Sequence, residues 1–211
     1  MRHLPEAWLR AAAAVGARSD VAQAGAELLG RYAEPHRRYH DLAHLDDVLR
    51  HVDALAEDAR DVHVVRMAAW FHDAVYDPTA ADNEERSALL AQTTLSELRV
   101  EDGITAEVAR LVRGTADHAP EPGDLDAEVL CDADLAILAS GPERYQVYVD
   151  AIRAEYEHVD DHAFASGRAD VLRRLLARDP MFSTPTGRDR WEAAARANVT
   201  AELARLDRPE D

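Results

Sequence analysis

The sequence predicts an all-α protein, a single-domain helical bundle, and three observations support that prediction. Ala, Leu, Glu and Arg dominate the 211 residues, and these residues lose little side-chain entropy in a helix. Apolar residues recur at helical spacing, and no stretch alternates apolar and polar residues as a sheet strand would. Turn-forming residues separate the periodic stretches without a long linker or a repeat. We expect one domain over residues 1–211, with a core over about 32–140 and C-terminal helices over about 142–206 packed on it.

The two most distinct helices are predicted early in this core. In the segment Asp41–Glu57, Asp41 is placed to cap the start of an amphipathic helix, and the apolar stripe consists of Leu45, Val48, Leu49, Val52 and Leu55. The segment Val62–Val75 is apolar nearly all round, so we expect its helix to be central and buried.

Four further helices are predicted from apolar stripes. The stripes are Ala88, Ala91, Leu95 and Leu98; Ile104, Val108, Leu111 and Val112; Tyr145, Val149, Ile152 and Tyr156; and Val171, Leu172, Leu175 and Leu176. Asp134 lies in the run VLCDADLAIL, which we interpret as the start of another helix. Breaks such as Asp77-Pro78, Gly141-Pro142 and Asp179-Pro180 fall where the periodicity stops.

The composition excludes several classes of chemistry. All 24 basic side chains are arginine, and the absence of lysine excludes Schiff-base catalysis and the usual phosphate-binding GxxxxGK loop. The single cysteine, Cys131, excludes a disulfide framework, a four-cysteine zinc site and a cysteine-ligated iron–sulfur cluster. It also fits a reducing compartment, and we expect the protein to be cytoplasmic.

The acidic charge narrows the range of partners. A net charge of −17 argues against binding a long nucleic acid or an anionic lipid surface, because both interactions depend on basic side chains. No apolar run approaches the roughly 20 residues that a membrane-spanning helix needs. A small anionic substrate remains compatible with this charge, and the sequence does not determine the oligomeric state.

Histidine and aspartate residues indicate a metal site. His72 and Asp73 end the most apolar predicted helix, where burial of both groups is costly unless a partner satisfies them. His44 lies in the first turn of the preceding helix, and Asp134 is a carboxylate among apolar residues. Imidazole and carboxylate ligands together suit divalent transition metals. A structural hydrogen-bonded pair of His72 and Asp73 is the alternative to a metal site.

The order of these residues, in the stretches YHDLAH, AAWFHDAVYD and CDADLAIL, resembles the HD-domain superfamily of metal-dependent phosphohydrolases. More narrowly, RRYHDLAH, WFHDAVYD, DNEERSA, IRAEY and GRADVL are similar to stretches of a bacterial family of small predicted HD hydrolases. The resemblance runs from about Tyr32 to Leu206. It implies an all-helical HD-type core and a divalent metal ion (Mn, Mg, Fe, Co, Ni or Zn) held by His44, His72, Asp73 and Asp134. It also implies hydrolysis of a phosphate ester or anhydride, usually of a nucleotide.

Candidate acid and base groups lie close to the predicted metal ligands. Asp73 itself, Glu84, Asp77 and His118 are the catalytic candidates, because a hydrolase must activate water or protonate the leaving oxygen. Glu84 and its neighbour Glu85 could instead stabilise the start of a helix through the helix dipole, and His118 could stabilise a helix end in the same way. Asp77 resembles a second acid that some nucleotide-cleaving HD enzymes carry, but Tyr76 stands here where those enzymes have another acid.

The candidates for substrate binding are Arg37, Tyr39, His40, Arg153 and Arg168. Without lysine, arginine must recognise any anion, and its planar fork matches phosphate. Each arginine has a structural alternative, such as an ion pair of Arg153 with Glu157 one turn later. His40 precedes His44 by one turn, so the two rings can share a face. The structural alternative is that His40 only packs against its neighbours or caps the start of the helix.

The function predicted from these residues is a metal-dependent phosphohydrolase that acts on a small phosphate ester or anhydride by attack of metal-bound water. Two alternatives remain open. One is a di-iron HD-type oxygenase, for which only His118 and His40 could supply the additional histidine ligands. The other is a non-catalytic ligand-binding HD domain.

Overall fold

The regular structure of the protein is helical, as the sequence predicts. The computed structural model describes residues 3–207, and within that range it contains no strand. The elements are α1 (Leu4–Ala14), α2 (Val21–Tyr32), α3 (Leu42–Ala54), α4 (Val62–Phe71), α5 (Asn83–Glu97), α6 (Asp102–Arg113), α7 (Leu125–Leu135), the 3-10 helix η1 (Ala136–Ala139), α8 (Pro142–Glu155), α9 (Asp161–Leu176) and α10 (Pro185–Leu206).

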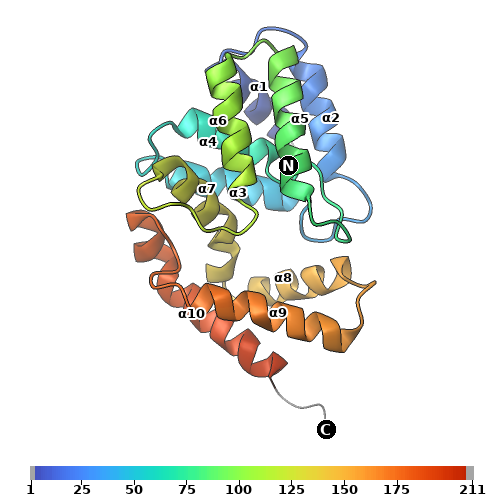
Figure 1. The fold of residues 1–211 in the computed structure, drawn as a ribbon, viewed down its shortest axis with the longest axis vertical. Coiled ribbons are helices and arrows are strands. Elements are labelled where there is room, and N and C mark those ends of the chain that lie inside the picture. The colour runs from blue at the N-terminus through green and yellow to red at the C-terminus, as the bar shows by residue number, and fades with distance from the viewer. Residues whose placement is uncertain (1–2, 208–211) are drawn as a thin grey trace.

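The helices gather into two bundles (Figure 1). The N-terminal bundle comprises α1 to α7 and is organised around α4, which packs against α1, α3, α5, α6 and α7. Trp8 meets both Trp70 and Phe71 of α4 edge to face, at ring-centroid distances of 5.4 and 6.0 Å. The prediction that this helix is central and buried is therefore confirmed. The apolar core of this bundle begins at Leu4, well before the predicted start near residue 32.

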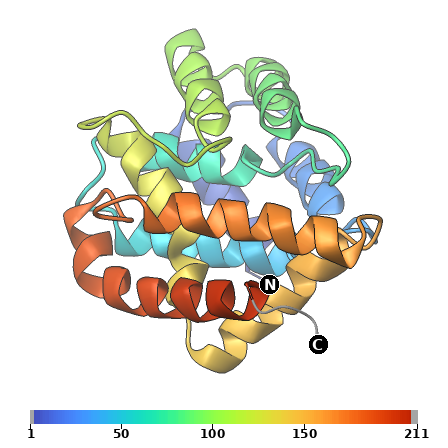
Figure 2. The same ribbon diagram turned by 60° about the horizontal axis from the view of Figure 1, so that its bottom comes forward.

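The C-terminal bundle comprises η1, α8, α9 and α10 and has an apolar core of its own. The helix α10 packs on η1 and on α9, and Figure 2 shows α9 and α10 side by side across one face of the molecule. Trp191 of α10 packs against both cores and so joins the two bundles into one domain.

A buried carboxylate also joins the bundles. Asp132 of α7 accepts hydrogen bonds from the backbone N–H groups of Ser183 and Thr184 and from the Thr184 hydroxyl, at 2.7–2.8 Å. Gly187 in the first turn of α10 passes so close that an added Cβ would lie 2.7 Å from Asp132 Oδ2. These contacts fix where α10 begins relative to α7.

Three boundaries decide the geometry of the site. Asp41 caps α3 as predicted, because its Oδ1 accepts hydrogen bonds from the backbone N–H groups of Ala43 and His44 at 2.7 and 3.2 Å. The helix α4 ends at Phe71 instead of continuing to Val75, so His72 and Asp73 lie just beyond the end of the helix. The prediction that Asp134 starts a helix is wrong, because Asp134 lies in the last turn of α7, which begins at Leu125.

None of the helices between residues 3 and 207 combines the length and the apolar character needed to cross a bilayer.

Candidate metal centre

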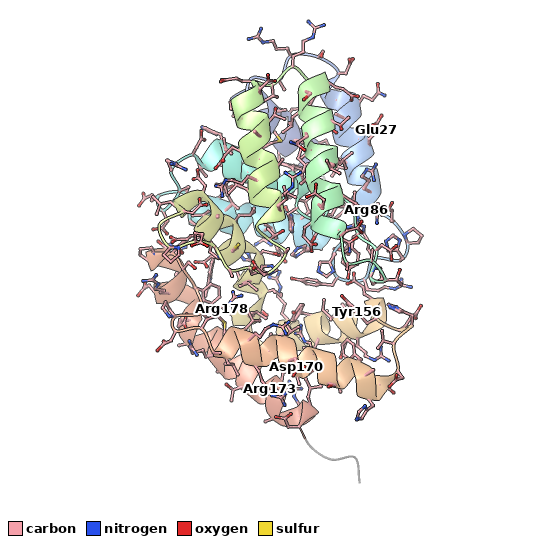
Figure 3. The ribbon with its side chains drawn as sticks, viewed as in Figure 1. Glu27, Arg86, Tyr156, Asp170, Arg173 and Arg178 are labelled. Carbon is pink, nitrogen blue, oxygen red and sulfur yellow. The ribbon has the colours of Figure 1, made fainter. Side chains whose placement is uncertain are left out.

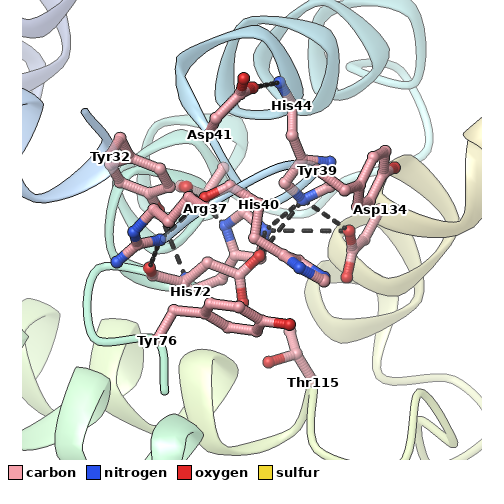
Figure 4. A network of polar contacts seen from close by, with 12 residues as sticks. Tyr32, Arg37, Tyr39, His40, Asp41, His44, His72, Tyr76, Thr115 and Asp134 are labelled. Carbon is pink, nitrogen blue, oxygen red and sulfur yellow. Dashed lines mark hydrogen bonds and ion pairs between the residues drawn. The ribbon is translucent and has the colours of Figure 1, made fainter. Parts of the chain in front are cut away.

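Four side chains from three helix ends meet at the base of a cleft. His44 lies in the first turn of α3, His72 and Asp73 follow α4, and Asp134 lies in the last turn of α7. His44 Nε2 lies 3.1 Å from His72 Nε2, 3.3 Å from Asp73 Oδ2 and 3.2 Å from Asp134 Oδ1. Figure 4 shows His44, His72 and Asp134 pointing toward one another. We call these four residues the His–Asp cluster.

The cluster has the donor chemistry of a metal site. His44, His72 and Asp134 each offer a ligand atom, and these atoms all lie within 4.8 Å of one another. His72 Nδ1 is 2.8 Å from the carbonyl oxygen of Ala69, so this nitrogen donates its hydrogen and the neutral ring keeps its lone pair on Nε2, facing the cluster. Histidine ligands of metals commonly make such a bond through their second nitrogen. The residues present therefore fit a metal ion, as predicted for His44, His72 and Asp134.

Asp73, the fourth predicted ligand, lies outside this group of mutually close ligand atoms but contacts both imidazoles. Its Oδ2 lies 3.1 Å from His72 Nε2 and 3.3 Å from His44 Nε2. The two carboxylates together carry two negative charges, which balance the charge of a divalent cation, while the two imidazoles bind as neutral ligands.

Protonation balances the same charges when no ion is bound. Burial raises the pKa of Asp73 and of Asp134, but the neighbouring imidazoles outweigh this effect and hold both pKa values well below the ordinary range. Burial lowers the pKa of His44, yet its hydrogen bonds to Asp134 and Asp73 outweigh that effect and raise the pKa to about 10. Metal binding at this cluster therefore requires the loss of protons from imidazole.

His118 lies against the cluster, where the sequence predicted a functional group. Its Nε2 is 2.7 Å from Asp134 Oδ2, and its backbone adopts a left-handed φ of 51°. Arg178 donates hydrogen bonds to the carbonyl oxygens of Asp117 and His118 and so holds this loop from the C-terminal bundle. A non-glycine residue in this conformation needs such support from its surroundings.

His40 and Tyr39 lie beside His44 of the cluster. The rings of His40 and Tyr39 have their centroids 5.5 and 4.7 Å from that of His44. His40 Nδ1 bonds to Glu155 Oε2 at 2.7 Å, and the hydroxyl of Tyr76 donates to the same oxygen at 2.8 Å. Both predicted residues therefore stand beside the candidate metal ligands.

Glu155 of α8 is a residue of the site that the sequence analysis missed. Its side chain is fully buried, and Oε1 accepts the backbone N–H groups of Arg38, Tyr39 and His40 at 2.8–2.9 Å. Burial raises the pKa of Glu155, but the bonds from His40 and the backbone N–H groups outweigh this and lower the pKa to about 2. The stretch IRAEY contained the signal, since Glu155 is an acid on the apolar side of its helix.

Arg37 is not placed to bind substrate, which corrects that prediction. Its side chain is fully buried behind the cluster. The guanidinium donates to the carbonyl oxygens of His40 and Asp73, each at 2.8 Å, and to that of Ala74 at 3.3 Å. Arg37 therefore fixes the backbone of His40 beside that of Asp73.

Arg153 also points away from the site. It donates to the carbonyl oxygens of Tyr156 and Val159 and pairs with Asp161 at 2.6 Å, so it holds the connection between α8 and α9. Arg168, also predicted to bind substrate, lines the cleft, but its charge is paired with Glu202 at 2.8 Å.

The two acids predicted after α4 differ in position. Glu84 lies in the first turn of α5 and lines the cleft. Asp77 does not line it, because its Oδ1 accepts hydrogen bonds from the backbone N–H and the hydroxyl of Thr79 at 2.9 and 2.7 Å. A catalytic role for Asp77 is therefore corrected to a turn-capping role, and Glu85 forms an exposed ion pair with Arg113.

The cleft lies between the two bundles and has a volume of about 1020 Å³. Asp73, Asp134, His40 and His118 line it on the side of the N-terminal bundle. Aromatic side chains from both bundles also line it, namely Tyr39, Tyr76, Tyr148, Tyr156 and Phe164. The cleft is large enough for a nucleotide-sized ligand.

A scan of the chain against protein-family models gave no match, and searches among curated proteins and among solved structures gave none either. The resemblance to the HD-domain superfamily therefore stays a prediction from the sequence motifs.

Proposed function

We propose that the protein is a metal-dependent phosphohydrolase that acts on a small phosphate ester or anhydride, with nucleotides as the first substrates to test. The observation that carries this proposal is the His–Asp cluster at the base of an open cleft. Two buried imidazoles and two carboxylates converge there from helix ends far apart in the sequence. The order His, His-Asp, Asp of the resembled superfamily gives independent support.

A divalent metal, when bound, supplies an acidic water and neutralises charge on a phosphoryl oxygen. The residues of the chain contribute position and proton transfer. His118 bonds to Asp134 and lines the cleft, so it is placed to give a proton to a leaving oxygen. Glu84 lines the same cleft, and its carboxylate is the group that we propose accepts a proton from water.

The charge of the protein favours a small substrate. With 41 acidic against 24 basic residues, the surface repels a long polyanion, whereas a single phosphate can be accepted locally.

The test uses the purified protein with its metal content measured by mass spectrometry. Phosphate release is followed over a panel of nucleotides and phosphate esters, with Mn, Mg, Fe, Co, Ni or Zn added in turn. The variant His72→Ala should lose bound metal and activity. The matched control is His63→Ala, which removes an exposed histidine from α4, the helix that His72 follows, and should retain both metal and activity. Absence of phosphate release with every metal and substrate would defeat the proposal.

A second candidate, a di-iron oxygenase, is favoured by the two extra histidines beside the cluster. His118 contacts Asp134 directly, and the His40 ring lies 5.5 Å from that of His44. Two irons per chain together with dioxygen consumption would support this function. One ion per chain with phosphate release supports the hydrolase, and a bound ligand without turnover supports a binding domain.

A further inference from the structure

The helix α9 presents two different faces. One face lines the cleft with Arg168 and Arg174, and Arg178 continues it just beyond the helix end. The other face carries Arg173, which pairs with Asp170 at 3.0 Å and with Asp207 at 2.6 Å. In Figure 3, Arg178 lies between the two bundles, whereas Arg173 lies beside Asp170 on the outer side of α9.

The arginines on the cleft face differ in how their charges are compensated. Arg168 is neutralised by Glu202 and also donates to the hydroxyl of Tyr148 at 3.0 Å. Among residues 3–207, no carboxylate lies within ion-pair distance of Arg174 or Arg178. The hydrogen bonds of Arg178 go to the neutral carbonyl groups of the His118 loop. Two positive charges therefore stay uncompensated on this wall of the cleft.

The position of these two arginines on the cleft wall distinguishes them. Other arginines between residues 3 and 207, such as Arg99 and Arg190, also have no carboxylate within ion-pair distance, but they do not line this cleft. Arg174 lies in the last turn of α9 and Arg178 lies just beyond its end, and like charges on the same wall repel each other. An anion bound between them would relieve that repulsion, and the arginine fork would contact it through two hydrogen bonds.

We propose that Arg174 and Arg178 form a binding site for a second oxyanion of the ligand, a phosphate or carboxylate distinct from the group at the His–Asp cluster. The statement that the first group is a phosphate rests on the proposed function, whereas the oxyanion site itself does not. The cleft of about 1020 Å³ is far larger than one phosphate requires. The ligand class is therefore a small metabolite with two separated anionic groups.

The first experiment measures binding of inorganic phosphate to metal-free protein by calorimetry, so its readout does not depend on turnover. Arg174→Gln should weaken phosphate binding by about 10-fold or more, because a charge-assisted bidentate contact is lost. Arg173→Gln removes the same charge from the same helix but from its outer face, and should leave the affinity unchanged. Equal affinities for wild type and both variants would overturn the inference.

The second experiment compares substrates with and without a distal anion. A nucleoside 5′-monophosphate is set against the 3′,5′-bisphosphate, and glycerol 3-phosphate against 3-phosphoglycerate, so the two pairs distinguish a distal phosphate from a carboxylate. Arg174→Gln should raise KM selectively for whichever doubly anionic substrate is preferred, with kcat little changed. If no substrate is hydrolysed but phosphate binding still depends on Arg174, the hydrolase proposal fails and this one stands. If hydrolysis occurs and KM is insensitive to Arg174 for both pairs, this proposal fails alone.

Discussion

The two bundles contribute different things to the same cleft. All four residues of the His–Asp cluster come from the N-terminal bundle, at the ends of α3, α4 and α7, which pack around one apolar core. The C-terminal bundle contributes Glu155, Arg168, Arg174 and Arg178, which hold or extend the walls around that cluster. Any metal bound at the cluster would therefore be held by one bundle, whereas the shape of the cleft depends on the joint between both.

The helix α7 offers the sharpest test of this difference. Asp132 and Asp134 are two residues apart, yet Asp134 faces the cluster and Asp132 faces the start of α10. The same Asp→Asn change at the two positions should separate metal binding from the joining of the bundles.

Asp134→Asn should have the largest effect, a loss of at least about 100-fold in metal affinity, since even residues that merely support a ligand cost 10- to 100-fold. It removes a charged ligand and the partner of His118. Metal titration followed by calorimetry measures the loss. Unchanged affinity would show that Asp134 is not a ligand.

Asp132→Asn should lower the free energy of unfolding by about 2 kcal/mol, because the single amide oxygen of asparagine can replace only one of the two carboxylate oxygens that accept the three hydrogen bonds. The expected cause is a weaker joint between the bundles, so metal affinity should stay within about 2-fold of wild type. Urea unfolding and metal titration on the same sample distinguish the two effects. A variant that loses its metal as well would contradict the separate roles of the bundles.

Glu155→Gln should reduce activity by about 10-fold while metal stays bound, because His40 and the 38–40 backbone lose a charged acceptor. The change also has a signature in pH. Since the folded pKa of Glu155 is lowered from 4.5 to about 2, its contribution to stability is complete above pH 4.5 and is lost as pH falls toward 2.

Wild type should therefore lose stability relative to Glu155→Gln as the pH falls through that window, as measured by thermal melts at a series of pH values. A stability difference that does not change with pH would contradict the low pKa.

Asp77→Asn should have the smallest effect, with little change in stability and none in activity, because asparagine can also cap the Thr79 turn. Phosphate release under the conditions that support wild-type turnover provides the measurement. A large loss of activity would return Asp77 to the catalytic set.

Local patterns in the sequence were enough to predict two of the three helices that carry the cluster, α3 and α4. Asp41 before an apolar stripe specified the start of α3, and the all-apolar run identified α4 as central. The helix that carries Asp134 was predicted to start near this residue, whereas it ends there. Its buried acids Asp126, Glu128 and Asp132 obscured the apolar periodicity. The helices α1 and α2 were not predicted, although their apolar faces are about as pronounced as that of α3.

The arginines show what local patterns could not provide. Arg37 and Arg153 carry the same charge as Arg174, but they do not line the cleft, and they donate to backbone carbonyl groups. For Arg37, one of those carbonyl groups belongs to Asp73, which is remote in the sequence. Whether an arginine is available to an anion depends on such tertiary contacts, which short motifs do not specify.

The position of Trp191 makes the joint between the bundles visible to fluorescence. Trp8 and Trp70 are each 1% exposed within the N-terminal core, whereas Trp191 is partly buried between the two cores, 5.3 Å from the ring of His51 and 5.5 Å from that of Phe182. Indole emission moves to longer wavelength when water reaches the ring. Separation of the bundles would therefore appear as a partial red shift from Trp191 alone, before the two tryptophans of the N-terminal core report complete unfolding.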